Sequence, residues 1–143
     1  MKKNLAALAT MMVAAAVMML ATAVPTFAQH SGPMKVNFPF NFAVENERLT
    51  AGEYTIQRVA NGRLMIRSND DRVHTTFIVI PTQGKSAPEQ AHFIFRHYGN
   101  DYFLASIWTP GQDVGWEVLQ GKLEMELAKK ATTPVQTALL IGH

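Results

Sequence analysis

Cysteine is absent from the 143 residues of the chain. No disulfide, thiol nucleophile or lipid-modified cysteine after an export signal is therefore possible. The fold must be stabilised by core packing alone. A domain of this size can supply that packing, because it buries roughly two-thirds of the surface that its unfolded chain exposes. The length itself favours a single domain.

Most of the chain also lacks a net charge. The formal charge of +2 comes from 13 basic and 11 acidic residues, and two of the basic residues are Lys2 and Lys3. Residues 29–143 therefore carry equal numbers of each sign and are neutral overall. A protein that binds nucleic acid needs a basic surface to replace counterions on phosphate, so the charge balance disfavours this class.

The first 28 residues are typical of an export signal peptide. Lys2 and Lys3 form its positive start, an apolar stretch spans residues 5–24, and Ala28 is a small residue at the predicted cleavage site. The apolar stretch is also long enough to span a bilayer, so an uncleaved membrane anchor is the alternative. We expect cleavage, which leaves a single β-rich domain over 29–143 in the periplasm or outside the cell, without membrane contact.

Alternation of apolar and polar residues predicts strands along this domain. In the first one, over 36–44, Pro39 lacks an amide donor and indicates an edge or bulged strand. The further strands are predicted over 54–59, 63–68, 73–80, 91–98, 101–109 and, as a strand or docked tail, 135–141. Loops are predicted over 81–90 and 110–115.

Two hairpins are marked by their turn residues. At 61–62 a two-residue loop pairs Ile56 with Arg67, whereas a three-residue loop pairs Ile56 with Ile66 and keeps the apolar residues on one face. We prefer the second register for that reason, with Gly62 left-handed.

The second turn is Gly99-Asn100, which places Tyr98 opposite Asp101. One face of this hairpin is the predicted core; it holds Phe93, Phe95, His97, Tyr102, Leu104, Ser106 and Trp108. The other face mixes apolar and charged residues; it holds His92, Ile94, Arg96, Tyr98, Asp101, Phe103, Ala105 and Ile107.

Leucines at every fourth position predict one helix over 119–130. They are Leu119, Leu123 and Leu127, and Lys122, Glu126 and Lys130 form a charge ladder at the same spacing. The predicted fold class is mainly β: an antiparallel meander of about seven strands, forming a small barrel or a sandwich, with one C-terminal helix.

No enzyme motif is complete in the sequence. There is no Gly-x-Ser-x-Gly elbow, phosphate loop or dinucleotide fingerprint. His92 and His97 lie on opposite faces of one predicted strand, so we expect no metal site and no cofactor. His97 and Ser106 share a face, but no carboxylate joins them, so no catalytic residue is predicted. Acidic residues close in sequence are interpreted as solvated charge; they are Glu45, Glu47, Glu53, Glu117, Glu124 and Glu126.

Four residues are the candidates for lining a ligand site: His97, Tyr102, Trp108 and Arg96. The first three belong to the aromatic face of the second hairpin, which could border a cavity inside a barrel. Arg96 lies opposite Phe103 in the predicted register. We interpret it as a structural salt bridge over the ring, with Asp101 diagonally across; the alternative is a polar handle beside an apolar groove.

Several short motifs lie between residues 36 and 128: Phe38-x-Phe40, Leu49-x-Ala51-Gly52-x-Tyr54, Phe95-x-x-Tyr98-Gly99-x-x-Tyr102-Phe103-Leu104, Ile107-Trp108 with Gly111, Gly115-x-Glu117 and Glu124-x-Glu126-Leu127-Ala128. In these motifs the chain resembles a family of small uncharacterised exported bacterial proteins, common in soil-dwelling lineages. The resemblance implies export and a β fold, but no activity or cofactor. The Leu-x-Ala-Gly-x-Tyr turn also occurs in exported β-sandwich modules, where it is a structural corner.

The sequence thus favours a non-catalytic exported β domain with a binding or envelope-associated structural role. One alternative is a carrier of a small apolar ligand in a barrel cavity, because a barrel of about eight strands can enclose such a ligand. The other is an enzyme of unidentified class that uses His97 or Glu117. The expected partners are a small apolar ligand or an envelope protein, and not nucleic acid.

Overall fold

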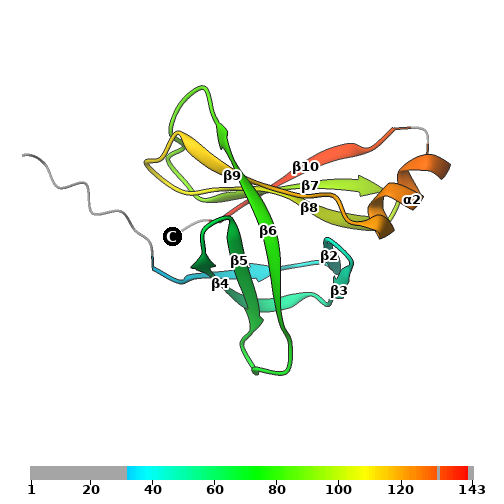
Figure 1. Ribbon diagram of the computed structural model, residues 1–143, viewed down its shortest axis with the longest axis horizontal. Coiled ribbons are helices and arrows are strands. Elements are labelled where there is room, and N and C mark those ends of the chain that lie inside the picture. Colours follow the sequence, from blue (N-terminus) through cyan, green and yellow to red (C-terminus); the bar gives the residue numbers. More distant parts are fainter. Residues whose placement is uncertain (1–31, 132, 142–143) are drawn as a thin grey trace, which may run out of the picture. The chain divides into compact units, whose positions relative to one another are not determined.

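The computed structural model describes residues 32–131 and 133–141, shown in Figure 1. Over these residues the chain is mainly β, with ten strands and one helix, α2 (Lys122–Lys130). The strands are β1 (Met34–Phe38), β2 (Phe42–Val44), β3 (Glu47–Leu49), β4 (Gly52–Ala60), β5 (Arg63–Ser68), β6 (His74–Gln83), β7 (His92–Tyr98), β8 (Asp101–Trp108), β9 (Val114–Val118) and β10 (Val135–Leu140). The predicted signal peptide over 1–28 lies outside the described residues. Within the described part of the chain, no helix combines the length and apolar character needed to cross a membrane.

Eight strands form one antiparallel array in the order β1-β4-β5-β6-β9-β8-β7-β10. β6 links its two halves, because its first residues pair with β5 and its last with β9 (Figure 1). The β2–β3 hairpin joins β8 through a parallel pairing of Ala43 with Phe103. The sheet is not closed into a barrel. The order departs from a simple meander where β1 pairs with β4 and β6 with β9.

The single strand predicted over 36–44 is two strands. The chain leaves the extended ladder at 39–41, so that β1 pairs with β4 and β2 pairs with β3 and β8. Pro39 explains the break, because it has no amide hydrogen for a ladder bond. β1 lies at an edge of the sheet, as Pro39 predicted.

Two further strands were not predicted from the sequence. β3 is only three residues long and follows the turn at 45–46. β9 begins at Val114, inside the segment predicted as a loop, and pairs with β6 and β8. The β9 sequence Val-Gly-Trp-Glu-Val does alternate, and this signal could have revealed it.

The predicted register of the first hairpin is confirmed, but its loop is different. Ile56 pairs with Ile66, while Ala60 pairs with Arg63 around a two-residue turn. A bulge at Val59 takes up the extra residue. The apolar pattern therefore fixed the register along the strands, and the bulge reconciles it with the tight turn. Gly62 has φ +71°, the left-handed conformation expected of it.

The second hairpin contains a bulge that corrects its predicted faces. Tyr98 pairs with Asp101 as predicted, but Ile94 pairs with Ser106 and Phe95 with Leu104, so that Ala105 has no opposite residue. Beyond the bulge the side chains of β8 change face relative to those of β7. Ile107 therefore faces the core and is almost completely buried. Ser106 and Trp108 lie on the other face, contrary to the prediction.

The core between the strands is packed with aromatic rings around Phe38. The ring of Phe38 lies 4.4–5.9 Å, centroid to centroid, from the rings of Phe42, Tyr54, Phe93 and Phe95. Such tilted and edge-to-face pairs stabilise a core by about 0.5–1.5 kcal/mol each beyond their burial. Tyr54 also forms the corner expected of the Leu-x-Ala-Gly-x-Tyr turn, since its hydroxyl donates to the carbonyl oxygen of Thr50 at 2.7 Å.

The helix begins at Lys122, three residues later than predicted. Leu119 is still part of the extended chain, because its N–H donates to the carbonyl oxygen of Ile78 at 3.3 Å and continues the β6–β9 ladder. Gly121, whose backbone is in an extended conformation, is the N-cap residue of the helix. Leu123 and Leu127 pack against a second buried cluster, which consists of Ala43, Tyr98 and Phe103.

Candidate functional site

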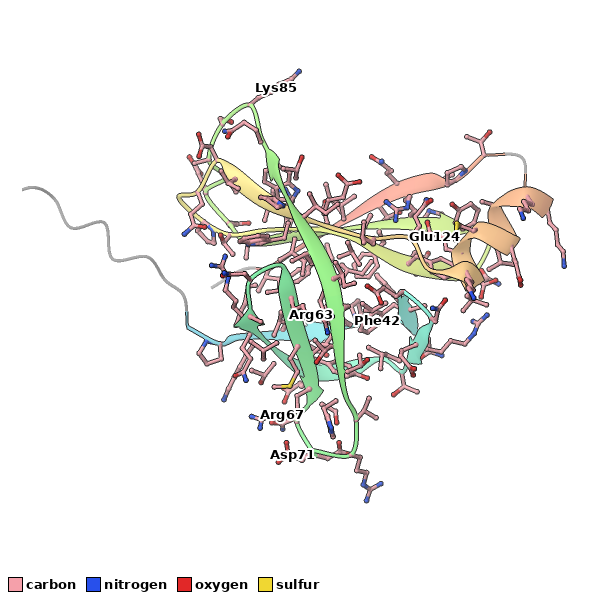
Figure 2. The ribbon with its side chains drawn as sticks, viewed as in Figure 1. Phe42, Arg63, Arg67, Asp71, Lys85 and Glu124 are labelled. Atoms are coloured by element: carbon pink, nitrogen blue, oxygen red, sulfur yellow. The ribbon has the colours of Figure 1, made fainter. Side chains whose placement is uncertain are left out.

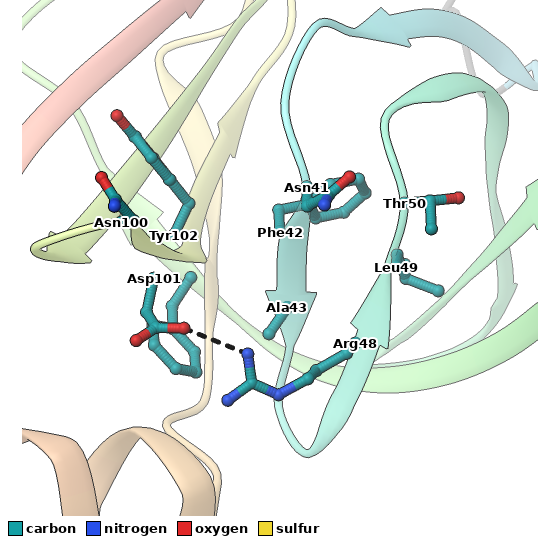
Figure 3. A pocket seen from close by; sticks show the side chains of 10 residues that line it. Asn41, Phe42, Ala43, Arg48, Leu49, Thr50, Asn100, Asp101 and Tyr102 are labelled. Atoms are coloured by element: carbon teal, nitrogen blue, oxygen red, sulfur yellow. Dashed lines mark hydrogen bonds and ion pairs between the residues drawn. The ribbon is translucent and has the colours of Figure 1, made fainter.

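A cleft of about 250 Å³ lies between the β2–β3 hairpin and the beginning of β8 (Figure 3). Four largely apolar residues, Phe42, Ala43, Leu49 and Phe103, belong to its lining. The polar lining residues are Asn41, Arg48, Thr50, Asn100, Asp101 and Tyr102. They come from the break between β1 and β2, from β3 and the turn after it, and from the β7–β8 hairpin.

One ion pair spans this cleft from hairpin to hairpin. Arg48 Nη1 on β3 donates to Asp101 Oδ1 at the start of β8 over 3.1 Å (Figure 3). Both side chains are exposed, so the pair itself contributes little to stability. Their charges cancel, and each retains further hydrogen-bonding capacity for a ligand.

Asn41 lies across the cleft from Asn100 and Tyr102 (Figure 3). Its Oδ1 accepts the N–H of Ala51 at 2.9 Å, which ties the β1–β2 break to the turn before β4. The amide nitrogen of Asn41 is then the group that can donate to a ligand. Asn residues suit such breaks because their side chains replace backbone hydrogen bonds.

Tyr102 is the only one of the four predicted ligand-lining residues that borders this cleft. Its ring stacks on Phe40 at 4.4 Å and on His97 at 4.8 Å, centroid to centroid. The structure therefore brings Tyr102 and His97 together as predicted, but as a ring stack. His97 Nδ1 lies 3.2 Å from the carbonyl oxygen of Gly99 and donates to it when protonated.

Arg96 lies on the opposite face of the β7–β8 hairpin, beneath α2. It pairs with Phe103 in the sheet as predicted, but its salt-bridge partner is Glu124 of the helix. Arg96 Nε donates to Glu124 Oε1 at 2.5 Å and Nη2 donates to Oε2 at 3.1 Å. Tyr98 donates to the same carboxylate at 3.2 Å. Asp101, the partner suggested by the sequence, binds Arg48 instead.

Glu124 is buried, with 2% of its surface exposed, so its interpretation as solvated charge was wrong. Figure 2 shows its position on α2. Burial lowers the pKa of Arg96, but its hydrogen bond to Glu124 and the negative charge there outweigh this and leave that pKa raised. Burial, together with the charge of Glu124, raises the pKa of Tyr98. The cluster of Arg96, Tyr98 and Glu124 thus fastens α2 to the sheet.

Trp108 lies at the far end of β8 from Tyr102. Its indole N–H donates to Ser106 Oγ at 3.1 Å, and its ring is stacked on His92 at 6.0 Å. The ring also fills the space where side chains at Gly84 and Gly115 would be. The four predicted ligand-lining residues therefore do not form one site, because the bulge at Ala105 and the length of β8 separate them.

A second cleft, of about 390 Å³, is lined by consecutive residues of β1 and β4, by Asn69 and by Ile141. It follows the surface of two paired strands, whereas the smaller cleft lies between two separate hairpins. For the residues that the structure describes, no group of three or more metal-ligating side chains comes together. Glu117, considered as a catalytic group, is an exposed residue of β9.

No protein-family model, curated protein or solved structure matches the chain. The resemblance to a family of exported bacterial proteins therefore stays a prediction from the motifs. The cleft residues Arg48, Asn41 and Asn100 were not predicted as a site. No local pattern marks them, because they meet only through the packing of two hairpins.

Proposed function

We propose that the chain is a non-catalytic, exported β domain that binds a small polar ligand in the Arg48–Asp101 cleft. The observation that carries this proposal is the convergence of six polar side chains, from three separate segments, beside an apolar lining. Sites for small ligands typically combine an apolar surface with a few placed polar groups. Export is supported by the signal-like residues 1–28 and by the family resemblance.

The chemistry of the cleft favours a neutral ligand rich in hydroxyl groups, such as a monosaccharide. Arg48 and Asp101 cancel in charge, and the amides of Asn41 and Asn100 offer both donors and acceptors. Phe42 and Phe103 lie beneath the cleft with only 3% and 1% of their surface exposed, so recognition depends on the polar side chains. The volume lies below the roughly 300 Å³ at which sites for drug-sized molecules begin, which limits the ligand to about one ring.

A ligand of apolar character inside the sheet is less favoured than the cleft. The interior is filled by Phe38, Phe93 and Phe95, all completely buried. A guest there would have to displace packed rings, which costs several kcal/mol for each large side chain removed from its contacts. The cleft needs no such rearrangement.

The proposal is tested by titrating the ¹⁵N-labelled protein with neutral monosaccharides, and with amino acids and small carboxylates for comparison. Chemical-shift changes should gather at 41–50 and 100–103. Arg48→Ala and Asp101→Ala should each weaken binding about tenfold, the loss of roughly one charge-assisted hydrogen bond. Arg67→Ala is the matched control, because Arg67 has a similar exposed ion pair with Asp71 away from the cleft.

Three results would contradict this proposal. Shifts that map elsewhere, or no shifts with any probe, would remove the cleft as the site. Chemical conversion of a probe that Arg48→Ala abolishes would show an enzyme. Recovery of the protein with residues 1–28 intact in the cytoplasm would contradict export, and the mass of the native protein decides this point.

A further inference from the structure

The tip of the β4–β5 hairpin joins an asparagine to a glycine. Asn61 and Gly62 form the turn between the two strands, where Ala60 pairs with Arg63. Among the asparagines of the described residues, Asn61 alone is followed by glycine, because the others precede phenylalanine, glutamate or aspartate. Glycine has no side chain to hinder a reaction at its backbone nitrogen. Asparagine is also one of the chemically labile residues of proteins.

The surroundings of Asn61 leave its amide accessible. Asn61 is exposed at the tip of the hairpin. Asn41 and Asn46 differ, because their side-chain oxygens accept backbone N–H groups at 2.9 and 3.3 Å and hold the amides in place. The side chain of Asn61 has no hydrogen bond of this kind to the described residues. Hairpin tips also open locally more readily than the strands that they connect.

We propose that Asn61 is a site of spontaneous deamidation. The Gly62 nitrogen gives its proton to hydroxide and attacks Cγ of Asn61, and the new C–N bond closes a succinimide ring. The bond from Cγ to Nδ2 breaks, and this nitrogen takes a proton from water and leaves as ammonia. The reaction is favoured because the attacking atom belongs to the neighbouring residue.

Water then opens the ring at one of its two carbonyl groups. Opening at Cγ releases a side-chain carboxylate and gives aspartate at position 61. Opening at the backbone carbonyl gives isoaspartate, whose main chain runs through Cβ and Cγ and is one carbon longer. Either product carries one additional negative charge at neutral pH.

The isoaspartate product should loosen the contact between the hairpin tip and β6. The carbonyl oxygen of Gly62 accepts the N–H of Val79 at 3.0 Å. The turn that sets this bond has only two residues between Ala60 and Arg63. An extra main-chain carbon does not fit that turn, so the Gly62 carbonyl must move away from Val79.

The reaction is measured on the mature protein, purified from cells that express the full chain. It is incubated in mildly acidic and mildly alkaline buffer, with and without urea, and mapped by peptide mass spectrometry. We expect a gain of about one mass unit at Asn61, faster than at any other described asparagine and faster in alkaline buffer. Reaction of Asn61 only in urea, or a faster reaction at another described asparagine, would overturn the proposal.

Gly62→Asp tests the part played by glycine. Aspartate tolerates the left-handed conformation of Gly62, which has φ +71°, and places a side chain beside the attacking nitrogen. We expect the deamidation rate at Asn61 to fall about tenfold, which corresponds to a barrier about 1.4 kcal/mol higher. Circular dichroism confirms that the variant folds. A rate equal to that of the parent would contradict the mechanism.

Asn61→Asp separates the effect of the charge from that of the longer main chain. This variant carries the charge of the product on a backbone of normal length, so Val79 should keep its protection against hydrogen exchange. The isoaspartate fraction, isolated by ion exchange, should lose about tenfold or more of that protection, while the amide of Phe95 stays unchanged. Equal protection of Val79 in the isoaspartate fraction and in Asn61→Asp would contradict the proposed loosening.

Discussion

The guanidinium of Arg96 and the carboxylate of Glu124 form a two-pronged ion pair in the contact between the sheet and α2, at 2.5 and 3.1 Å. Arg96 comes from β7, and Glu124 is the second residue after Lys122 in the helix. Two hydrogen bonds between one guanidinium and one carboxylate strengthen the attraction and also fix the relative orientation of the two side chains. The helix is only nine residues long, too short to be stable alone in water, so it depends on such tertiary contacts.

Replacing Glu124 by Gln should strongly destabilise the fold. The change keeps the shape but leaves the Arg96 charge without its partner in a site where the arginine side chain is only 15% exposed. Breaking a fully buried pair costs about 3–5 kcal/mol, and the partial exposure of Arg96 reduces our expectation to about 2 kcal/mol. Urea unfolding measures the loss. Glu126→Gln on the exposed side of the same helix should stay within about 0.5 kcal/mol of the parent. Equal effects in the two variants would refute the role of the pair.

Tyr98 should make the protein lose stability at high pH. Its pKa is raised in the folded state, by burial first and then by Glu124, whereas the unfolded chain ionises near pH 10. The folded state thus holds this proton more tightly. The resulting stability is complete below pH 10 and is lost as the pH rises above it. Tyr98→Phe should show a smaller loss between pH 9 and pH 11 than the parent in denaturant unfolding. Tyr102→Phe is the control, and an identical loss in Tyr98→Phe would contradict the prediction.

The strand registers were predictable where only one face of a hairpin is apolar. Between β4 and β5, Ile56 and Ile66 can share a face in only one register, and the structure has it. In β8 both faces are largely apolar, because Phe103, Ala105 and Ile107 alternate with Leu104, Ser106 and Trp108, of which only Ser106 is polar. Alternation cannot reveal a bulge there, since either set fits a core.

The cleft and the Arg96–Glu124 pair could not be predicted from local sequence patterns. Arg48 and Asp101 are 53 residues apart, and Arg96 and Glu124 are 28 residues apart. Each pair is formed by the packing of elements whose relative positions a periodicity does not encode. Glu124 did carry a signal, because it follows Leu123 and precedes Leu127 by three residues and so lies beside the buried stripe.

Gly121 should not tolerate a side chain. A Cβ there would lie 2.5 Å from the carbonyl carbon of Glu45 and 2.6 Å from Asn46 Oδ1, which accepts the N–H of Leu123 at 3.3 Å. The atoms of Glu45 in this contact belong to the backbone and cannot rotate away as a side chain could. The β2–β3 turn and the start of α2 must therefore move apart. We expect Gly121→Ala to cost about 1–3 kcal/mol by overpacking. Gly32→Ala is the control, because its new Cβ meets nothing within 4 Å. Thermal unfolding separates the two, and equal midpoints would disprove the close approach.

Gly115 should control the position of the Trp108 ring. A Cβ at Gly115 would lie 2.6 Å from two ring atoms of Trp108, and a Cβ at Gly84 would also lie 2.6 Å from the ring. In a Trp116→Phe parent, Trp108 is the only tryptophan left, so its fluorescence reports on this ring alone. Gly115→Ala should push the indole outward, shift its emission to longer wavelength and increase quenching by acrylamide. Gly84→Ala should act in the same direction, and the double variant should show less than the sum of the two effects, because both displace one ring. Emission and quenching that match the parent in both single variants would show that the ring does not lie against these glycines.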